Sequence, residues 1–328
     1  MAKWERLAAE TRALSKSGGH YRLLYKSTDR VTREIGRRRP DFIYGKRMST
    51  ASTGVEILST AISGSAPFMA GRLGSTEQNV VRFFLKHRQA GSSSGAPYPA
   101  SLCTDIATLS GVSPTDDETL DRFSSLYINA AKSLDILGVW FHHTERSVVR
   151  NEISSSSKLI PLRSMDPLSY PGMWTSALRG KSVCVVHPFR SSIESQYLRR
   201  DKVFRDPNIL PLFDLKVVQA VQAIGGLPPQ YDSWFSALDS MVDAVISTDC
   251  EVALLAAGAF GFPLAARLKL AGIKAIHIGG SLQLLFGIAG RRWDEKPYVQ
   301  NLMTEAWIRP NSDERPPGAN DVEGACYW

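Results

Sequence analysis

The sequence predicts an α/β fold in which a Rossmann-like, mostly parallel sheet carries helices on both faces and follows a basic helical N-terminal arm. Short apolar or β-branched runs alternate with amphipathic helical stretches, which is the pattern of βαβ units. Glycines follow several of these runs, where a strand gives way to a helix. The 328 residues exceed the usual size of one compact domain, so one large domain with an appendage is expected.

The hydrophobic pattern places each element of this fold. The arm is expected to span residues 1–50, with helices at 4–14 and 21–35, and the α/β domain with its docked C-terminal tail to span 51–328. The first half of the domain predicts helices and short strands in alternation, namely a helix at 54–62, a strand at 67–71, a turn and helix from 72, a helix at 115–135 and a strand at 138–141. The second half predicts strands at 181–186, 215–224, 251–256 and 274–278, with helices through 196–197, at 233–246 and at 263–271.

The charge is unevenly distributed along the chain. The formal net charge is +7, yet residues 1–50 hold 13 lysines and arginines against 5 acidic residues, whereas the remainder holds 26 against 27. A main body that is nearly neutral argues against a groove for nucleic acid, and none is expected as a partner. The arm itself is suited to peripheral contact with an anionic membrane surface, or to a solvated helical face packed on the domain.

Several protein classes are excluded by composition and motifs. With 43% hydrophobic and 22% charged residues the chain is an ordinary globular protein, and its longest apolar run, 252–266, is interrupted by glycines and a proline. The charged N-terminus lacks the apolar segment of a secretory signal, so a cytoplasmic protein is expected, with peripheral contact at the inner membrane face as a further option. The four cysteines form no metal-binding or disulfide pattern. A nicotinamide-dependent dehydrogenase is disfavoured because the full dinucleotide fingerprint is absent.

Ligands of open α/β sheets bind beyond the carboxyl ends of the strands, and the first such end here is Arg72-Leu-Gly-Ser-Thr-Glu77. Arg72 can pair with a phosphate, Gly74 lets the backbone approach it, and Glu77 can hold a cation or accept a proton. The alternative is a turn with a salt-bridged arginine and a glutamate that favours the helix dipole.

Three further strand ends carry candidate residues. His187 precedes Arg190 and Ser191 at a helix start, which is suited to an anion or to ordinary capping. Gly258-x-x-Gly261 permits close packing of a helix on a strand and is only part of a dinucleotide fingerprint. At the fourth end stand His277, Gly279, Arg291 and Arg292, and a histidine within a buried strand is also compatible with a purely structural role.

These strand ends resemble the GT-D glycosyltransferases, a bacterial fold class that transfers sugars from nucleotide-sugar donors. The resemblance rests on the stretch Arg72–Glu77 and on the block ALLAAGAFGFPLAARLKLAGIKAIHIGGSLQLLFG at 253–287, and it covers residues 55–290. It implies transfer of a sugar from a nucleotide diphosphate donor to an acceptor hydroxyl, in the synthesis of bacterial surface polysaccharide or glycoconjugates. The partners implied are that donor and a glycan or lipid-linked acceptor.

The resemblance also implies roles for individual residues. In the family an Arg-x-Gly-Asp-Gly-Glu stretch meets the donor diphosphate through a divalent cation, Mn²⁺ or Mg²⁺. Here Glu77 is kept, whereas Ser75 replaces the aspartate, and one carboxylate with a hydroxyl makes a weaker site for these ions. Glu77 is the expected catalytic residue and metal ligand, and the residues expected to bind the nucleotide sugar are Arg72, Gly74, Ser75, His187, Arg190, Ser191, Gly258, Gly261, His277, Gly279, Arg291 and Arg292.

The sequence leaves open which residue is the base and whether the protein is an enzyme, a binding protein or a surface-binding protein. The base that activates the acceptor could be Glu77, Asp232 or Glu323, because no spacing chooses among them. The loss of the aspartate at Ser75 also fits a non-catalytic nucleotide-sugar-binding or scaffold protein of the same fold. A third class is a membrane-surface or nucleic-acid protein that acts through the basic arm.

Overall fold

A seven-stranded parallel sheet organises the computed structural model, which describes residues 42–88, 95–142, 144–169, 173–223, 226–316, 318–321 and 324–328. The strand order is β5-β4-β3-β9-β8-β6-β7, and every pairing between neighbours is parallel. The strands are β3 (Met69–Gly71), β4 (Ile136–Val139), β5 (Lys158–Pro161), β6 (Ser182–His187), β7 (Asp214–Gln219), β8 (Val252–Leu255) and β9 (Lys274–His277). The predicted α/β class is confirmed.

Alternate side chains of the strands enter two separate cores. In β8, Val252 and Leu254 belong to one core, whereas Ala253 and Leu255 belong to the other. Strands that are buried on both faces read as nearly continuous apolar runs, and this is why the second half of the chain contains such runs. Within the described ranges no helix combines the length and apolar character needed to cross a bilayer.

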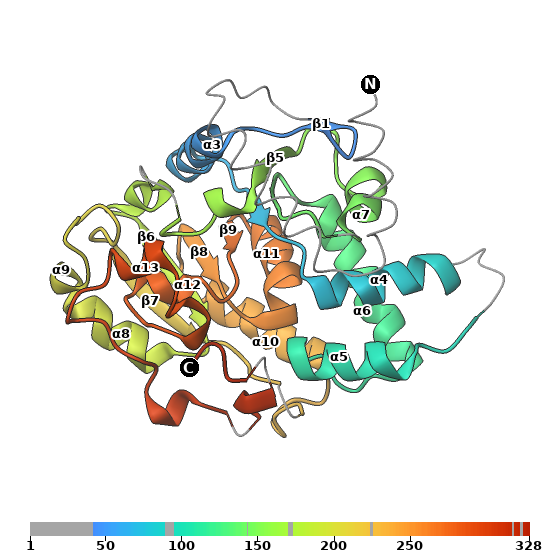
Figure 1. Cartoon of the computed structure of the whole chain (residues 1–328). Coiled ribbons are helices and arrows are strands. Elements are labelled where there is room, and N and C mark those ends of the chain that lie inside the picture. Colours follow the sequence, from blue (N-terminus) through green and yellow to red (C-terminus); the bar gives the residue numbers. More distant parts are fainter. Residues whose placement is uncertain are drawn as a thin grey trace, which may run out of the picture.

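Helices cover both faces of the sheet (Figure 1). One core is closed by α4 (Ser75–His87), α5 (Ala100–Ser110), α6 (Asp117–Lys132), α7 (Glu145–Asn151), α10 (Trp234–Ile246) and α11 (Gly261–Leu270). The other is closed by α3 (Ala51–Ser63), α8 (Arg190–Leu198), α9 (Arg200–Val203), α12 (Leu282–Leu285) and α13 (Pro297–Gln300). The connections that leave the neighbouring strands β3 and β9 therefore pass to opposite faces, and open α/β sheets bind ligands at the carboxyl ends of such a strand pair; we refer to this position as the β3–β9 crevice.

Short polar signals start several of these helices. The side chain of Ser233 accepts a hydrogen bond from the Ser236 backbone, and the Ser236 side chain accepts one from the Ser233 backbone, so α10 begins at a capping box. At the start of α6 the side chain of Asp116 accepts a hydrogen bond from the Thr119 backbone at 2.8 Å, which caps that helix. These caps fix helix starts that the hydrophobic pattern alone places only approximately.

The elements at the start of the described chain and between the strands differ from the predicted set. Residues 42–47 form a short antiparallel hairpin of β1 (Phe42–Ile43) and β2 (Lys46–Arg47), and α5, α7 and β5 were not predicted. The structure places β4 two residues earlier than the expected 138–141. The two predicted arm helices, at 4–14 and 21–35, lie outside the described residues, as does the end of the predicted strand 215–224.

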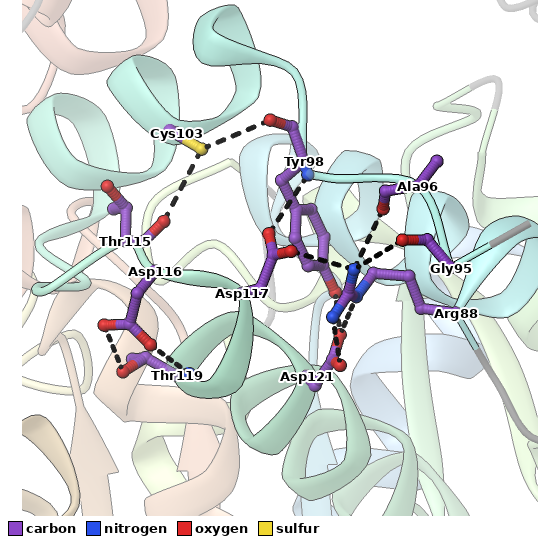
Figure 2. Close-up of polar contacts among 10 residues, drawn as sticks. All are labelled: Arg88, Gly95, Ala96, Tyr98, Cys103, Thr115, Asp116, Asp117, Thr119 and Asp121. Atoms are coloured by element: carbon purple, nitrogen blue, oxygen red, sulfur yellow. Dashed lines mark hydrogen bonds and ion pairs between the residues drawn. The ribbon is translucent and has the colours of Figure 1, made fainter.

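Arg88, at the end of α4, joins that helix to α6 and to the segment that leads into α5 (Figure 2). Its guanidinium pairs with both carboxylate oxygens of Asp121, at 2.6 and 2.9 Å, and with Asp117 at 2.9 Å. It also donates to the carbonyl of Ala96 at 2.9 Å and lies 5.3 Å from the ring centre of Tyr98. The side chain is 14% exposed, so one partly buried cation holds three segments together.

We expect Arg88→Ala to lower the free energy of unfolding by about 2–3 kcal/mol, because hydrogen bonds to charged groups contribute more than neutral ones and two aspartates lose their cationic partner, keeping, among the described residues, only hydrogen bonds from Tyr98. Urea unfolding followed by circular dichroism measures this. The matched control is Arg82→Ala, an exposed arginine on the same helix, for which a change within about 0.5 kcal/mol is expected. Equal effects of the two substitutions would contradict a joining role for Arg88.

Candidate functional site

The first candidate group begins where β3 ends. Arg72 follows Gly71 directly and is half-buried, with its guanidinium carbon 5.6 Å from the ring centre of Trp140. The indole Nε1–H of Trp140 donates to the Leu73 carbonyl at 3.0 Å, which fixes the ring beside the arginine. Among the described residues this guanidinium contacts an aromatic ring and forms no ion pair with a carboxylate, which leaves its charge available to an anionic ligand.

Helix α4 starts two residues later with Gly74 as its N-cap and Ser75 as its first residue. Glu77 is in the first turn, and its carboxylate folds back so closely over Gly74 that a Cβ at that glycine would overlap it. Only 8% of Glu77 is exposed, and burial raises the pKa of its carboxyl, opposed by its own backbone, by Arg72 and by the Ser110 hydroxyl. The backbone N–H groups at this helix start, together with Arg72, make an electropositive position next to a buried carboxyl.

Tyr127 of α6 reaches the same turn. Its hydroxyl accepts a hydrogen bond from the Gly74 backbone at 3.0 Å, and its ring stacks on Phe262 with centres 4.7 Å apart. Burial, with the nearby Glu77 carboxyl, raises the pKa of Tyr127 well above its usual range, so this phenol stays protonated. A neutral donor therefore lies beside the carboxyl of Glu77.

His277 ends β9 and pairs in register with Gly71 of β3. Burial, with Arg72 as a second cause, lowers the pKa of His277 to about 3, so the ring is a neutral imidazole. Its Nδ1 is buried without a hydrogen-bond partner among the described residues. The ring packs against the start of α11, where a Cβ on Gly261 would overlap it, so glycine at this position is what allows His277 its place.

Gly279 brings the β9 end against Arg72. Its φ is +78°, a conformation that favours glycine, and a Cβ there would lie 3.0 Å from Arg72 Nε. Gly258, after β8, also has a positive φ, and a Cβ there would lie 3.1 Å from the carbonyl oxygen of Ser110, the residue whose hydroxyl helps to lower the pKa of Glu77. The structure thus gathers one set of the predicted residues around the β3–β9 crevice, namely Arg72, Gly74, Ser75, Glu77, Gly258, Gly261, His277 and Gly279.

The other predicted residues lie in two further places. His187 ends β6, where its Nδ1 accepts from the Phe189 backbone at 3.0 Å and burial lowers its pKa to about 3. Arg190 is exposed on the first turn of α8 and pairs with Glu194 on the same helix at 2.9 Å. Of the other two candidates for the base that activates the acceptor, Asp232 is exposed just before α10, and Glu323 lies outside the described residues.

An anion already occupies the start of α8, and it comes from the chain itself. The carboxylate of Glu314 accepts from the Ser191 hydroxyl at 2.8 Å, from the Ser192 backbone at 3.2 Å and from the Ser192 hydroxyl. Glu314 is 8% exposed. The helix start that the sequence predicts as a ligand site thus anchors the C-terminal segment in this structure.

Arg291 and Arg292 also contact the C-terminal segment. Arg291 donates to the Gly324 carbonyl at 3.1 Å, and Arg292 donates to the Tyr327 hydroxyl at 2.7 Å. The ring of Tyr327 lies so close over Gly280 that a Cβ there would overlap it. The tail therefore packs on the loop that follows Gly279.

Three residues of this region were missed by sequence reasoning: Tyr127, Trp140 and Glu145. Tyr127 is on α6, which precedes β4; Trp140 follows β4 directly, and Glu145 begins α7. The signal that could have found them is the polar and aromatic run Trp140–Glu145 immediately after an apolar strand. Placing that strand at 138–141 put the first two residues of the run, Trp140 and Phe141, inside it.

Glu145 is fully buried and supports the β4 end. Its carboxylate accepts from the Phe141 backbone at 3.0 Å, from the Trp140 backbone at 3.4 Å and from the Tyr44 hydroxyl at 3.2 Å. Burial raises the pKa of Glu145 to about 7, against the lowering effect of these hydrogen bonds. It positions the loop that carries Trp140, and through it the ring beside Arg72.

We expect Glu145 to make the protein less stable as the pH rises from about 4.5 to 7. In this range the Glu145 carboxyl keeps its proton in the folded state and loses it in the unfolded state. Its contribution to the free energy of unfolding is therefore fully present below about pH 4.5, and about 3 kcal/mol is lost as the pH rises to about 7. Urea unfolding of wild type and Glu145→Gln at pH 4.5, 6 and 7.5 measures the difference. The glutamine variant should lack this component of the decline, and parallel pH profiles would contradict the assignment.

The residues around Glu77 do not fit a divalent cation well. Within the described ranges, no three histidine, cysteine, aspartate or glutamate side chains come together in a manner that could hold a metal ion. Glu77 is a lone carboxylate folded toward its own helix start, with the positive charge of Arg72 nearby. Mn²⁺ and Mg²⁺ prefer several hard oxygen ligands, and a neighbouring guanidinium disfavours a second cation.

Comparison with known proteins gives a likeness of overall architecture alone. No family model matches the chain, and no curated protein matches its sequence. A solved structure described as a selenomethionine-substituted domain of unknown function 1792 aligns with 83% of this chain and 93% of its own, at 10% identity and a TM-score of 0.45. Another, described as showing that this domain "has a distinct glycosyltransferase fold", aligns over the same shares at 11% identity and a TM-score of 0.43. Likenesses of this extent assign neither a family nor a reaction to the chain.

Proposed function

We propose that the chain is a glycosyltransferase that moves a sugar from a nucleotide diphosphate donor to an acceptor hydroxyl, with the donor diphosphate at the carboxyl ends of β3 and β9. The observation that carries this is the position of Arg72, a half-buried cation beside the start of α4 and next to a buried carboxyl. The motif resemblance of Arg72–Glu77 supports the same assignment. The acceptor class proposed is a glycan or lipid-linked sugar of bacterial surface polysaccharide or glycoconjugate synthesis.

In this proposal the chain stabilises the leaving diphosphate with groups that are already in place. Arg72 pairs with the phosphate oxygens, and the backbone N–H groups of Ser75 and Thr76 at the α4 start face the same charge. Gly279 keeps the loop after β9 free of a side chain beside the guanidinium. His277 is neutral and therefore adds no charge; it fills the space below Arg72.

Glu77 is the proposed base for the acceptor hydroxyl. A carboxyl whose pKa is raised by burial is a stronger base than an exposed one once it is ionised, and its ionised form is favoured at neutral pH over acidic pH. The proton that leaves the acceptor oxygen passes to the Glu77 carboxylate as the sugar–oxygen bond forms and the diphosphate departs. Because the residues fit a cation poorly, we propose that arginine and backbone donors meet the diphosphate charge without one.

A second candidate function is binding of the nucleotide sugar without transfer. It is favoured by one observation: the Glu77 carboxyl is buried and folded back over Gly74 at its own helix start, so it would have to turn outward to act as a base. The two candidates share the donor site and differ only in turnover. Peripheral contact of the arm 1–50 with the inner membrane face would suit either one.

The test is a panel of UDP-, GDP-, CMP- and dTDP-sugars, measured for binding by calorimetry and for slow hydrolysis of the donor, with and without manganese. The transferase proposal expects one donor to bind and to release sugar. Binding without release of sugar, even with candidate acceptors, would favour the second candidate. If no donor binds at any manganese concentration, both proposals fail.

A further inference from the structure

A surface cavity of about 620 Å³ lies beneath the C-terminal segment, apart from the Arg72 group. Its walls come from residues that lie far apart along the chain, among them Arg291, Asp294, Arg309, Arg315, Asn320 and Trp328. Its volume falls within the range of small-molecule sites in proteins, so it has room for a ligand much larger than a single phosphate. None of the roles proposed above for the β3–β9 crevice uses it.

The cavity carries an excess of positive charge. Three arginines, Arg291, Arg309 and Arg315, line it together with one carboxylate, Asp294. Asp294 is the partner of Arg309, whose Nη2 lies 2.8 Å from its Oδ1. Within the described residues, one guanidinium of the three is therefore neutralised by a carboxylate.

The other two arginines are oriented by neutral oxygens. Arg291 donates to the Gly324 carbonyl at 3.1 Å, and Arg315 donates to the Asn320 side-chain oxygen at 2.6 Å. Such contacts hold a guanidinium in one direction while its charge and its remaining N–H groups stay available. Two oriented cations from separate stretches thus face one cavity.

Beside the charges lies a fixed aromatic wall. Trp328 lines the cavity, and its indole Nε1–H donates to the Glu314 carbonyl at 3.4 Å. Its ring meets Phe189 edge to face, with centres 5.7 Å apart. An apolar surface next to two cations matches a ligand with an anionic end and an organic body.

We propose that this cavity binds a ligand carrying a diphosphate group, with Arg291 and Arg315 on the phosphates and Trp328 against the organic part. Two guanidinium groups on separate stretches of chain are complementary to two anionic groups in one ligand, and a planar guanidinium pairs well with phosphate oxygens. The chemistry is shared by a free nucleoside diphosphate and by a lipid diphosphate. This site is independent of the proposed glycosyl transfer and stands whether or not the β3–β9 crevice is catalytic.

The test uses inorganic pyrophosphate and calorimetry on the full chain at low salt. Wild type should bind saturably, and Arg291→Gln and Arg315→Gln should each weaken binding by about tenfold, the expected loss of one charge-assisted contact. The matched control is Arg179→Gln, an exposed arginine that likewise donates to an asparagine side chain, Asn208, at 3.1 Å and does not line the cavity. Because the proposed Arg72 site would also take up pyrophosphate, the same comparison is repeated in an Arg72→Gln background, where Arg291→Gln and Arg315→Gln should still weaken the remaining binding by about tenfold.

UDP and farnesyl diphosphate then distinguish the two sources of the diphosphate. Tighter binding of either than of pyrophosphate, lost in Arg315→Gln, supports the site and names the class of organic part. The proposal is overturned if pyrophosphate does not bind, or if its affinity is the same in wild type and in both cavity variants. Arg315→Lys, which keeps the charge and loses the planar fork, should fall between wild type and the glutamine variant. Thermal unfolding of each variant checks that the fold is kept, as expected for exposed side chains.

Discussion

Arg72→Gln is expected to weaken binding of the nucleotide-sugar donor by about 100-fold, because a diphosphate at the β3–β9 crevice would lose two charge-assisted hydrogen bonds. The fold should be kept. Arg72 is half-buried, its described contacts are the Trp140 ring and the space beside Gly279, and glutamine retains the apolar stem. Calorimetry with the donor found in the nucleotide-sugar panel measures the change.

Two other arginines decide whether the loss is specific. Arg82→Gln removes an exposed charge from α4, the helix that follows Arg72, and should change donor affinity less than threefold. Arg190→Gln tests the other predicted contact, which the structure places on α8 in an ion pair with Glu194. If Arg190→Gln weakens donor binding strongly and Arg72→Gln does not, the donor lies at β6 rather than at β3, and the proposed site is wrong.

The strands were the most predictable part of the fold. In β6, β8 and β9 the runs are apolar on both faces, bounded by polar residues or glycines, and long enough to leave one interpretation. The helix α5 was hidden because it follows a Ser-, Gly- and Pro-rich stretch and starts at Pro99 without a side-chain cap. The strand β5 was hidden because only Leu159 and Ile160 give it an apolar centre.

The candidate site was predictable only where it is local in sequence. Arg72, Gly74 and Glu77 lie within one turn after a strand, so their proximity follows from the chain itself. Tyr127 reaches Gly74 across 53 residues, and Trp140 reaches Leu73 across 67, and such contacts are decided by how helices and strands pack. Glu314 meets Ser191 across 123 residues, so nothing in the local sequence shows that the α8 start is already bound.

Glu77→Gln separates the two proposed functions. If Glu77 is the base, this substitution should reduce transfer by about 100-fold or more while donor affinity changes less than threefold, because general base catalysis contributes on this scale. Glutamine keeps the size of the side chain and an oxygen that can accept from the helix start and from the Ser110 hydroxyl. Initial rates and donor affinity, measured on the same preparation, give the two values.

The pH dependence of the rate and its response to manganese test whether Glu77 acts as a base or as a metal ligand. Burial raises the pKa of Glu77, so the rate of transfer by wild type should increase as the pH rises above the usual pKa range of a glutamate and the base becomes ionised. The residual rate of Glu77→Gln should not show this increase. A manganese titration should leave the rate of wild type unchanged, since a lone carboxylate beside Arg72 is a poor cation site. A rate that depends on manganese and a donor affinity that falls in Glu77→Gln would instead make Glu77 a metal ligand, and the base would then have to be sought elsewhere, first at Asp232 and Glu323.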